Sequence, residues 1–234
     1  MDNRLNVCVF DSMIAEEMYS FRARELLDGN SIFVTDTQDL RSVRNFRMEQ
    51  LHGNEPFCIT DLPNASNELL IRELSSIYRS DLSLIVSSDE MKYLKQVYGV
   101  PQEKLSMASF FYDPPSAENL TPFTARQHFV TIGNGIHPPN KDSIYYMRHH
   151  LWPKLKQQLA DPSDVEYHIY GAYLDNYHSL TSKDLKFTIK GRLSNLNDLS
   201  KYRVNMCMLR GGAGIKGKIA DGWLRGLPAI SMKG

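Results

Sequence analysis

The chain has 234 residues, of which 42% are hydrophobic and 23% are charged. This composition is typical of a globular protein and excludes a fibrous or disordered one. Lys plus Arg and Asp plus Glu both count 27, so no bulk positive field is present to attract nucleic acid or an anionic membrane surface. Any anion must therefore be bound by local groups.

No apolar run in the sequence approaches the length of a membrane span. The first residues lead into a strand-like segment without an apolar stretch of signal length, so we expect no signal peptide there. The cysteines Cys8, Cys58 and Cys207 are widely spaced, and we expect them to be reduced and buried. These features predict a cytoplasmic protein, at most peripherally attached to a membrane.

In the first half of the chain, short β-branched or aromatic runs alternate with longer amphipathic segments. That alternation is typical of a parallel sheet flanked by helices. The predicted strands are residues 6–10, 32–35 and 82–86. The predicted helices are residues 12–27, ending at Asp28, residues 67–79, and a third helix that is capped at 87–90 and runs to 98.

The second half repeats the alternation after a stretch without periodicity. We expect domain 1 at residues 1–112, a linker at 113–126 and domain 2 at 127–234. The predicted strands of domain 2 are residues 128–132, 165–170, 186–189, 204–209 and 229–232, and the predicted helices are residues 141–159, 196–202 and 216–225. The fold class is therefore α/β. Because residues 6–10 read as a middle strand and no helix follows the last strand, both domains are expected to be incomplete.

A glycine loop gives the sharpest local signal. Gly211–Gly214 lies between a buried strand and a helix, so that unpaired amides and a positive helix end converge where a phosphate could bind. Lys216 and Lys218 add positive charge. The pattern matches neither the Walker loop nor the dinucleotide fingerprint. The alternative is a glycine turn that only tightens a strand-helix junction.

A second loop follows the first strand of domain 2, also at a carboxyl end where α/β sheets bind ligands. Gly133 opens it, and Asn134 and His137 could donate hydrogen bonds to a diphosphate. A lone loop histidine is more often structural or solvated, and that alternative stays open for His137.

Two further clusters have plainer explanations. Asp36 and Asp39 follow a strand and could serve as a general base or bind sugar hydroxyls, but a capping cluster explains them as well. His149 and His150 are adjacent on a helix and so point to different faces, without partners at zinc-site spacing. The sequence predicts no metal site.

Several motifs resemble, in order, the family-4-like glycosyltransferases (glycosyl transferases group 1) of the GT-B type. The motifs similar to the nucleotide-binding domain of that family are residues 129–134, 137–140, 166–171, 211–218 and 226–228. The motifs similar to its acceptor-side domain are residues 10–11, 36–44, 79–81 and 98–101. The resemblance covers nearly the whole chain.

The resemblance implies two Rossmann-like domains and a sugar transfer, with retention, from a UDP- or GDP-sugar to an acceptor, without a metal or other cofactor. It implies that Gly212, Gly214, Lys216 and Lys218 hold the diphosphate near Asn134. Asp221 would face the donor ribose. Lys216 and Asp221 would then be the catalytic residues.

Departures from the family pattern leave a second function open. Ala213 stands where the family has the first glutamate of a pair, and Asp221 is one methylene shorter than the second glutamate. Asn134 replaces a residue that is often basic. The alternative is therefore a non-catalytic GT-B-like fragment or nucleotide-sugar-binding module; a phosphosugar epimerase is a weaker third reading. The sequence does not reveal the base, the sugar, the acceptor or the oligomeric state.

Overall fold

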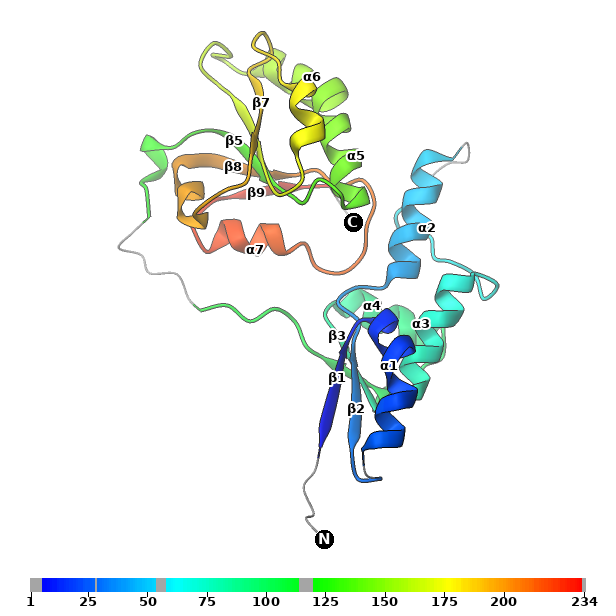
Figure 1. Cartoon of the computed structure of the whole chain (residues 1–234). Helices are drawn as coiled ribbons and strands as arrows, with labels where there is room; N and C mark the ends of the chain where they lie inside the picture. The colour runs from blue at the N-terminus through cyan, green and yellow to red at the C-terminus, as the bar shows by residue number, and fades with distance from the viewer. Residues whose placement is uncertain (1–5, 28, 54–57, 114–119, 233–234) are drawn as a thin grey trace. The chain divides into compact units, whose positions relative to one another are not determined.

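The computed structural model describes residues 6–27, 29–53, 58–113 and 120–232 (Figure 1). The predicted helix end at Asp28 and residues 114–119 of the predicted linker lie outside the described residues. By its contacts the chain divides into two units, Met1–Phe111 with Gly212–Ile215, and Tyr112–Gly211 with Lys216–Gly234. The break after Phe111 lies one residue before the expected end of domain 1 at residue 112.

The first unit contains a sheet of four parallel strands in the order β1-β2-β3-β4. The strands are β1 (Val7–Asp11), β2 (Ile32–Asp36), β3 (Leu82–Ile85) and β4 (Leu105–Met107). The sequence-based prediction of the first three is confirmed. We did not predict β4, because a strand of three residues is too short to show alternation.

Helices α1 (Met13–Leu26), α2 (Arg41–His52), α3 (Glu68–Arg79) and α4 (Ser88–Lys92) accompany this sheet, and α4 continues into a π-helical turn. Side-chain caps begin two of them. The side chain of Ser87 accepts from the Glu90 amide, as predicted, and that of Asn67 accepts from the Leu70 amide, a cap that we did not predict. The main core of the unit consists of Leu40, Val43, Ile77, Ile85, Leu94, Val100 and Leu105.

The buried residues of helix α1 are one apolar residue, Met13, and two polar ones, Glu16 and Ser20. Met18, Phe21 and Leu26 are 63%, 64% and 68% exposed, whereas Glu16 is only 1% exposed. The carboxylate of Glu16 pairs with the guanidinium of Arg79 in α3, with 2.5 Å between Oε2 and Nη2. Helical spacing of four apolar residues therefore predicted the helix, but of these only Met13 lies on its buried side.

The second unit has five parallel strands in the order β7-β6-β5-β8-β9. The strands are β5 (Gln127–Ile132), β6 (Tyr167–Tyr170), β7 (Phe187–Gly191), β8 (Tyr202–Cys207) and β9 (Ala229–Ser231), each close to its predicted range. The chain proceeds outward from β5 to β7 and then returns to the other side of β5 for β8 and β9. The strand order therefore reverses between β5 and β8, which is the topological switch point of an open α/β sheet.

Helices cover both faces of this second sheet. Helix α5 (Pro138–Tyr146), a π-helical turn and α6 (Trp152–Gln158) form the predicted long helix, and α7 (Gly217–Trp223) follows the glycine loop. Met206 belongs to the core beneath α5 and α6, whereas its neighbour Asn205 donates a hydrogen bond to the carbonyl of Lys218 in α7. Because neighbours in a strand point to opposite faces, α7 lies across the sheet from α5 and α6 (Figure 1).

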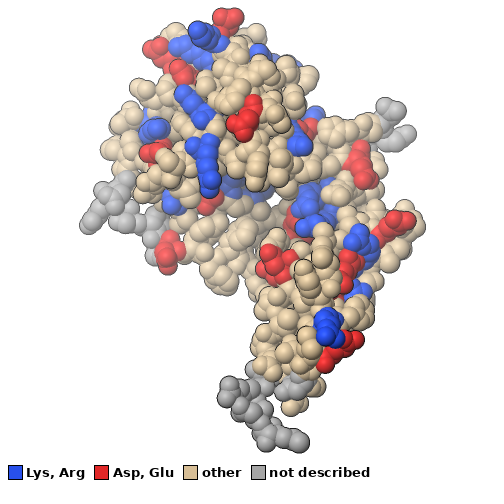
Figure 2. All heavy atoms as spheres, in the orientation of Figure 1, with Lys and Arg blue, Asp and Glu red and all other residues tan. Residues whose placement is uncertain are grey.

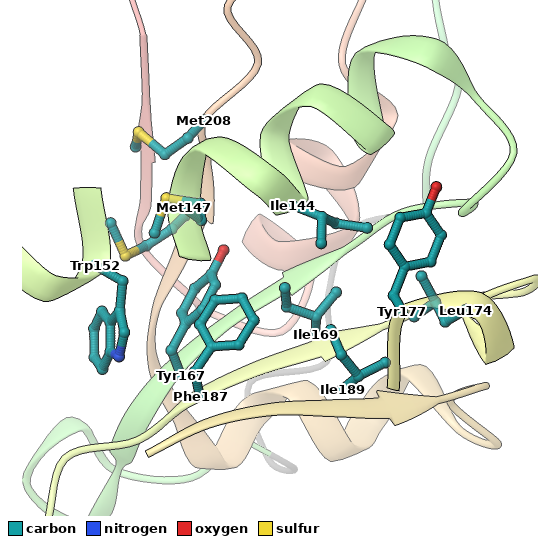
Figure 3. Packing of buried hydrophobic residues seen from close by; sticks show 11 residues of the cluster. Ile144, Met147, Trp152, Tyr167, Ile169, Leu174, Tyr177, Phe187, Ile189 and Met208 are labelled. Atoms are coloured by element: carbon teal, nitrogen blue, oxygen red, sulfur yellow. The ribbon is translucent and has the colours of Figure 1, made fainter. Parts of the chain in front are cut away.

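An aromatic cluster fills the core beneath α5 and α6 (Figure 3). Trp152 is fully buried, stacks on Tyr167 with ring centroids 5.3 Å apart, and donates from Nε1 to the carbonyl of Leu185 at 2.8 Å. The ring of Phe187 also packs against Tyr167, with centroids 5.4 Å apart. This cluster anchors the helix that follows the β5 loop.

Surface features correct one expectation. Cys207 is buried and Cys8 half-buried, but Cys58 is exposed, so the expectation that all three thiols are buried is wrong for Cys58. The loop before α3 that carries Cys58 leaves its side chain at the surface.

On the face that Figure 2 shows, acidic and basic side chains are interspersed. In the part of the chain that the structure describes, no helix has the length and apolar character needed to cross a membrane.

Candidate functional site

The pairing of β5 with β8 brings the two predicted loops to one edge of the second sheet. Val130 lies opposite Asn205 in this parallel register, so both strands end on the same side. Residues 133–137 follow β5, and residues 208–216 follow β8. The carboxyl edge at a switch point is where open α/β sheets bind ligands.

Close packing explains the glycines around β5. A Cβ on Gly133 would lie 2.7 Å from Cγ of Asn140, and a Cβ on Gly171 would lie 1.7 Å from the carbonyl oxygen of Gly133. The carbonyl of Asn134 accepts from Nδ2 of Asn140 at 3.0 Å, and its Oδ1 accepts from the Ile136 amide at 2.9 Å. The predicted residues Gly133 and Asn134 are thus held in a tight turn.

His137 is the residue that precedes α5. Its amide donates to the carbonyl of Asn134 at 3.2 Å, and its carbonyl accepts from the Lys141 amide at 3.1 Å. Pro138 and Pro139 occupy the first turn, where the missing N–H groups are not required. The backbone of His137 therefore closes the loop and starts the helix.

Lys218 connects the two loops from α7. Its Nζ donates to Oδ1 of Asn140 at 2.6 Å, and burial lowers the pKa of this ammonium. The nearby charge of Lys216 lowers the same pKa further. Within the described residues, the ammonium of Lys216 forms no hydrogen bond or ion pair. Two neighbouring cations thus share this edge, and no carboxylate of the described residues forms an ion pair with either of them.

Arg210 forms a second connection that the sequence did not reveal. Its guanidinium binds the carboxylate of Asp142 in α5 through two hydrogen bonds, with 3.0 Å between Nε and Oδ2, and it lies 4.5 Å over the ring of Tyr146. The hydrogen bonds to Asp142 raise the pKa of Arg210. The available signal was a basic residue directly after a buried strand and before the glycines.

The glycine loop itself makes contacts that correct a prediction. The Gly214 amide donates to Oε1 of Glu90 at 2.8 Å, and Nη1 of Arg47 donates to the carbonyl of Gly212 at 2.9 Å. The expectation that the amides of this bend are unpaired is therefore wrong for Gly214. The reason is a buried carboxylate 124 residues away in the chain, which no local pattern indicates.

Asp221 lies in α7, five residues after Lys216. It is half-buried, and burial raises the pKa of its carboxyl group while the charge of Arg225 acts in the opposite direction. Within the described ranges no hydrogen bond joins Asp221 to Asn134 or Lys216. The structure thus places Lys216 and Lys218 next to each other and leaves Asp221 outside their contacts.

Asp36 and Asp39 make local contacts, but neither side chain caps α2: the amides of Leu40 and Arg41 at its start donate to Glu90 and Glu73. Asp39 pairs with Arg44, and Oδ1 of Asp36 accepts from the Gln38 amide at 3.1 Å. No group of three His, Cys, Asp or Glu side chains in the described part of the chain is arranged to hold a metal ion.

Solved structures provide the comparison for this arrangement. A scan against protein-family models and a search of curated protein sequences gave no match. The chain is similar to a pneumococcal O-GlcNAc transferase, GtfA, solved with UDP and GlcNAc, at 12% identity and a TM-score of 0.60, covering 98% of this chain and 42% of that one. It is also similar to TarM of S. aureus, solved with UDP, at 11% identity and a TM-score of 0.56, covering 93% and 45%.

A trehalose-6-phosphate synthase, studied for glycosyltransfer with retention, matches at 7% identity and a TM-score of 0.52, covering 97% of this chain and 58% of that one. This chain thus spans about half the length of the structures it resembles. At these identities the likeness concerns the fold. Two Rossmann-like units with parallel sheets flanked by helices give the chain the GT-B fold of these glycosyltransferases.

Proposed function

We propose that the chain is a glycosyltransferase that binds a nucleotide-diphosphate sugar, a UDP- or GDP-sugar, at the switch point of its second unit. It transfers the sugar to an acceptor with retention of anomeric configuration. The observation that carries the proposal is the convergence of the β5 and β8 loops, where Lys216 and Lys218 lie close together and pair with no carboxylate among the described residues.

The chemistry needs groups that neutralise the diphosphate as it departs. Lys216 is the residue we assign to this role, because its ammonium has no partner among the described residues and a charged donor strengthens a hydrogen bond to phosphate. The hydrogen bond between Lys218 and Asn140 links the start of α7 to the start of α5. We propose that Asn134 and His137 contact the diphosphate, that Asp221 binds the ribose, and that no cofactor takes part.

The similar structures support this choice of donor. GtfA and TarM were solved with UDP, and the trehalose-6-phosphate synthase was studied for transfer with retention. Free cysteines and the balanced charge also fit our proposal of a cytoplasmic location.

A nucleotide-sugar-binding module without transfer is the second candidate. Ala213 stands where the resemblance expects a glutamate, and its side chain packs against the core of the first unit. Binding of UDP or GDP without any hydrolysis or transfer would identify this second function.

Calorimetric titration with UDP and GDP tests the proposal. We expect one nucleotide to bind, and Lys216→Ala to weaken it on the order of 10- to 100-fold, as expected for a hydrogen bond to a charged group of about 1.5–3 kcal/mol. Lys154→Ala, at an exposed position of α6, is the matched control and should bind like the wild type. If neither nucleotide bound at millimolar concentration, the proposal would be refuted. NMR of the product sugar then distinguishes retention from inversion.

A further inference from the structure

The contact between Glu90 and the glycine loop resembles an occupied anion site. Oε1 of Glu90 accepts from two amides, those of Leu40 and Gly214, each at 2.8 Å. Two amides directed at one anionic oxygen are the arrangement with which loops bind a phosphate oxygen. Here the oxygen belongs to the protein.

The loop fits closely against the residues around Glu90. A Cβ on Gly214 would lie 2.8 Å from Cβ of Asp39, and Gly214 has a φ of +65°, so only glycine brings its amide to the carboxylate without strain. Arg47 holds the carbonyl of Gly212, and Ala213 packs on the core of the first unit. The hydrogen bond between Gly214 and Glu90 is thus one of several contacts that fix the position of the glycine loop.

Glu90 is nevertheless a poorly compensated anion. It is 2% exposed, and its second oxygen, Oε2, is buried without a hydrogen-bond partner among the described residues. Its charged neighbours Asp39 and Glu73 are acidic, and no basic side chain in the described ranges pairs with it. Burial is the main cause that raises the pKa of Glu90 to about 7. A buried charge with incomplete partners is held at an energetic cost, so another acceptor can replace it at the loop.

We propose that Glu90 is an internal competitor of the donor: its carboxylate occupies the Gly214 amide, and a nucleotide-diphosphate sugar must displace it in order to bind the loop. This inference rests on the proposed function, because it takes the glycine loop as part of the donor site. It makes the contact autoinhibitory rather than merely structural.

Two variants separate these roles. Glu90→Gln keeps a neutral acceptor, and Glu90→Ala removes both oxygens. At pH 8, where Glu90 is ionised, we expect the Kd for UDP or GDP to fall below that of the wild type, about threefold for Gln and about tenfold for Ala, as for the loss of one competing charged hydrogen bond. Asp89→Asn, at the exposed neighbouring position that pairs with Lys92, is the control and should leave the Kd unchanged.

Amide hydrogen exchange of Gly214 gives an independent readout. In the nucleotide-free proteins we expect protection in the wild type, loss of protection in Glu90→Ala, and its return when the nucleotide is added. An unchanged or increased Kd in both folded variants would overturn the inference while leaving the proposed function standing. Absence of binding by every variant and by the wild type would refute the proposed function and the competition with it.

Discussion

The buried carboxyl group of Glu90 should make the stability of the first unit depend on pH. Its folded pKa is raised from the ordinary value of 4.5 to about 7, chiefly by burial. A raised folded pKa contributes stability that is fully present below about pH 4.5 and is lost as the pH rises to about 7. The difference of about 2.5 corresponds to about 3 kcal/mol, because each pKa unit is worth 1.36 kcal/mol.

The perturbation is Glu90→Gln, which keeps a carbonyl oxygen for the amides of Leu40 and Gly214 but cannot ionise. We expect the variant to be similar in stability to the wild type near pH 4.5 and more stable by up to about 3 kcal/mol at pH 8. Removing a charge would therefore stabilise the fold.

The assay must report on the first unit. Both tryptophans, Trp152 and Trp223, lie in the second unit, so their fluorescence follows that unit and is the internal control. Native-state hydrogen exchange of amides in the core of the first unit, such as those of Ile77 and Ile85, measures the free energy of interest at pH 5, 6, 7 and 8. Equal slopes of stability against pH in the two proteins would refute the reasoning.

Three further predictions concern packing and charge. Arg79→Ala should destabilise the first unit by about 2–3 kcal/mol in chemical denaturation, because it leaves the Glu16 carboxylate buried without its partner; the loss is smaller than for a fully buried pair, since the Arg79 side chain is 30% exposed. The control Arg72→Ala removes an exposed pair and should cost under about 1 kcal/mol. Equal losses in the two variants would contradict this explanation. Gly171→Ala should lower the free energy of unfolding by about 3 kcal/mol in thermal unfolding and weaken nucleotide binding, because the new Cβ would clash with the Gly133 carbonyl. Gly191 has open space around it, so Gly191→Ala should cost only about 1–2 kcal/mol of backbone strain. Similar melting temperatures for the two variants would contradict this steric argument. In an NMR titration His168 should protonate below its ordinary pKa of 6.5, because burial lowers that pKa, so its contribution to stability is lost as the pH falls below 6.5; a midpoint at or above 6.5 would contradict the burial argument.

Local patterns in the sequence determined the elements. Alternating apolar runs predicted β1, β2, β3 and all five strands of the second unit, helical spacing predicted α3, and the capping residue Ser87 predicted the start of α4. These signals work because side-chain period and capping act between residues that are near one another in the chain. The strand β4 was not predicted, because three residues are too few to show an alternation of apolar and polar side chains.

Long-range contacts decided what the local pattern could not. The spacing of Phe21 and Leu26 indicated a helix, yet pairing with Arg79 placed Glu16 on its buried side. The spacing of apolar residues predicts that a helix forms, but the element that packs against the helix decides which of its sides is buried.

For the candidate site, too, some features followed from the sequence and others only from the tertiary structure. The sequence by itself determined that Gly133 and Gly211–Gly214 form glycine loops at strand ends, since a strand followed by glycine and a helix is a local signal. Only the tertiary structure, through the order β7-β6-β5-β8-β9, placed the two loops beside each other and linked Lys218 to Asn140. Only the tertiary structure brought Glu90 to Gly214, because a hydrogen bond between residues 124 positions apart depends on the folded path of the whole chain.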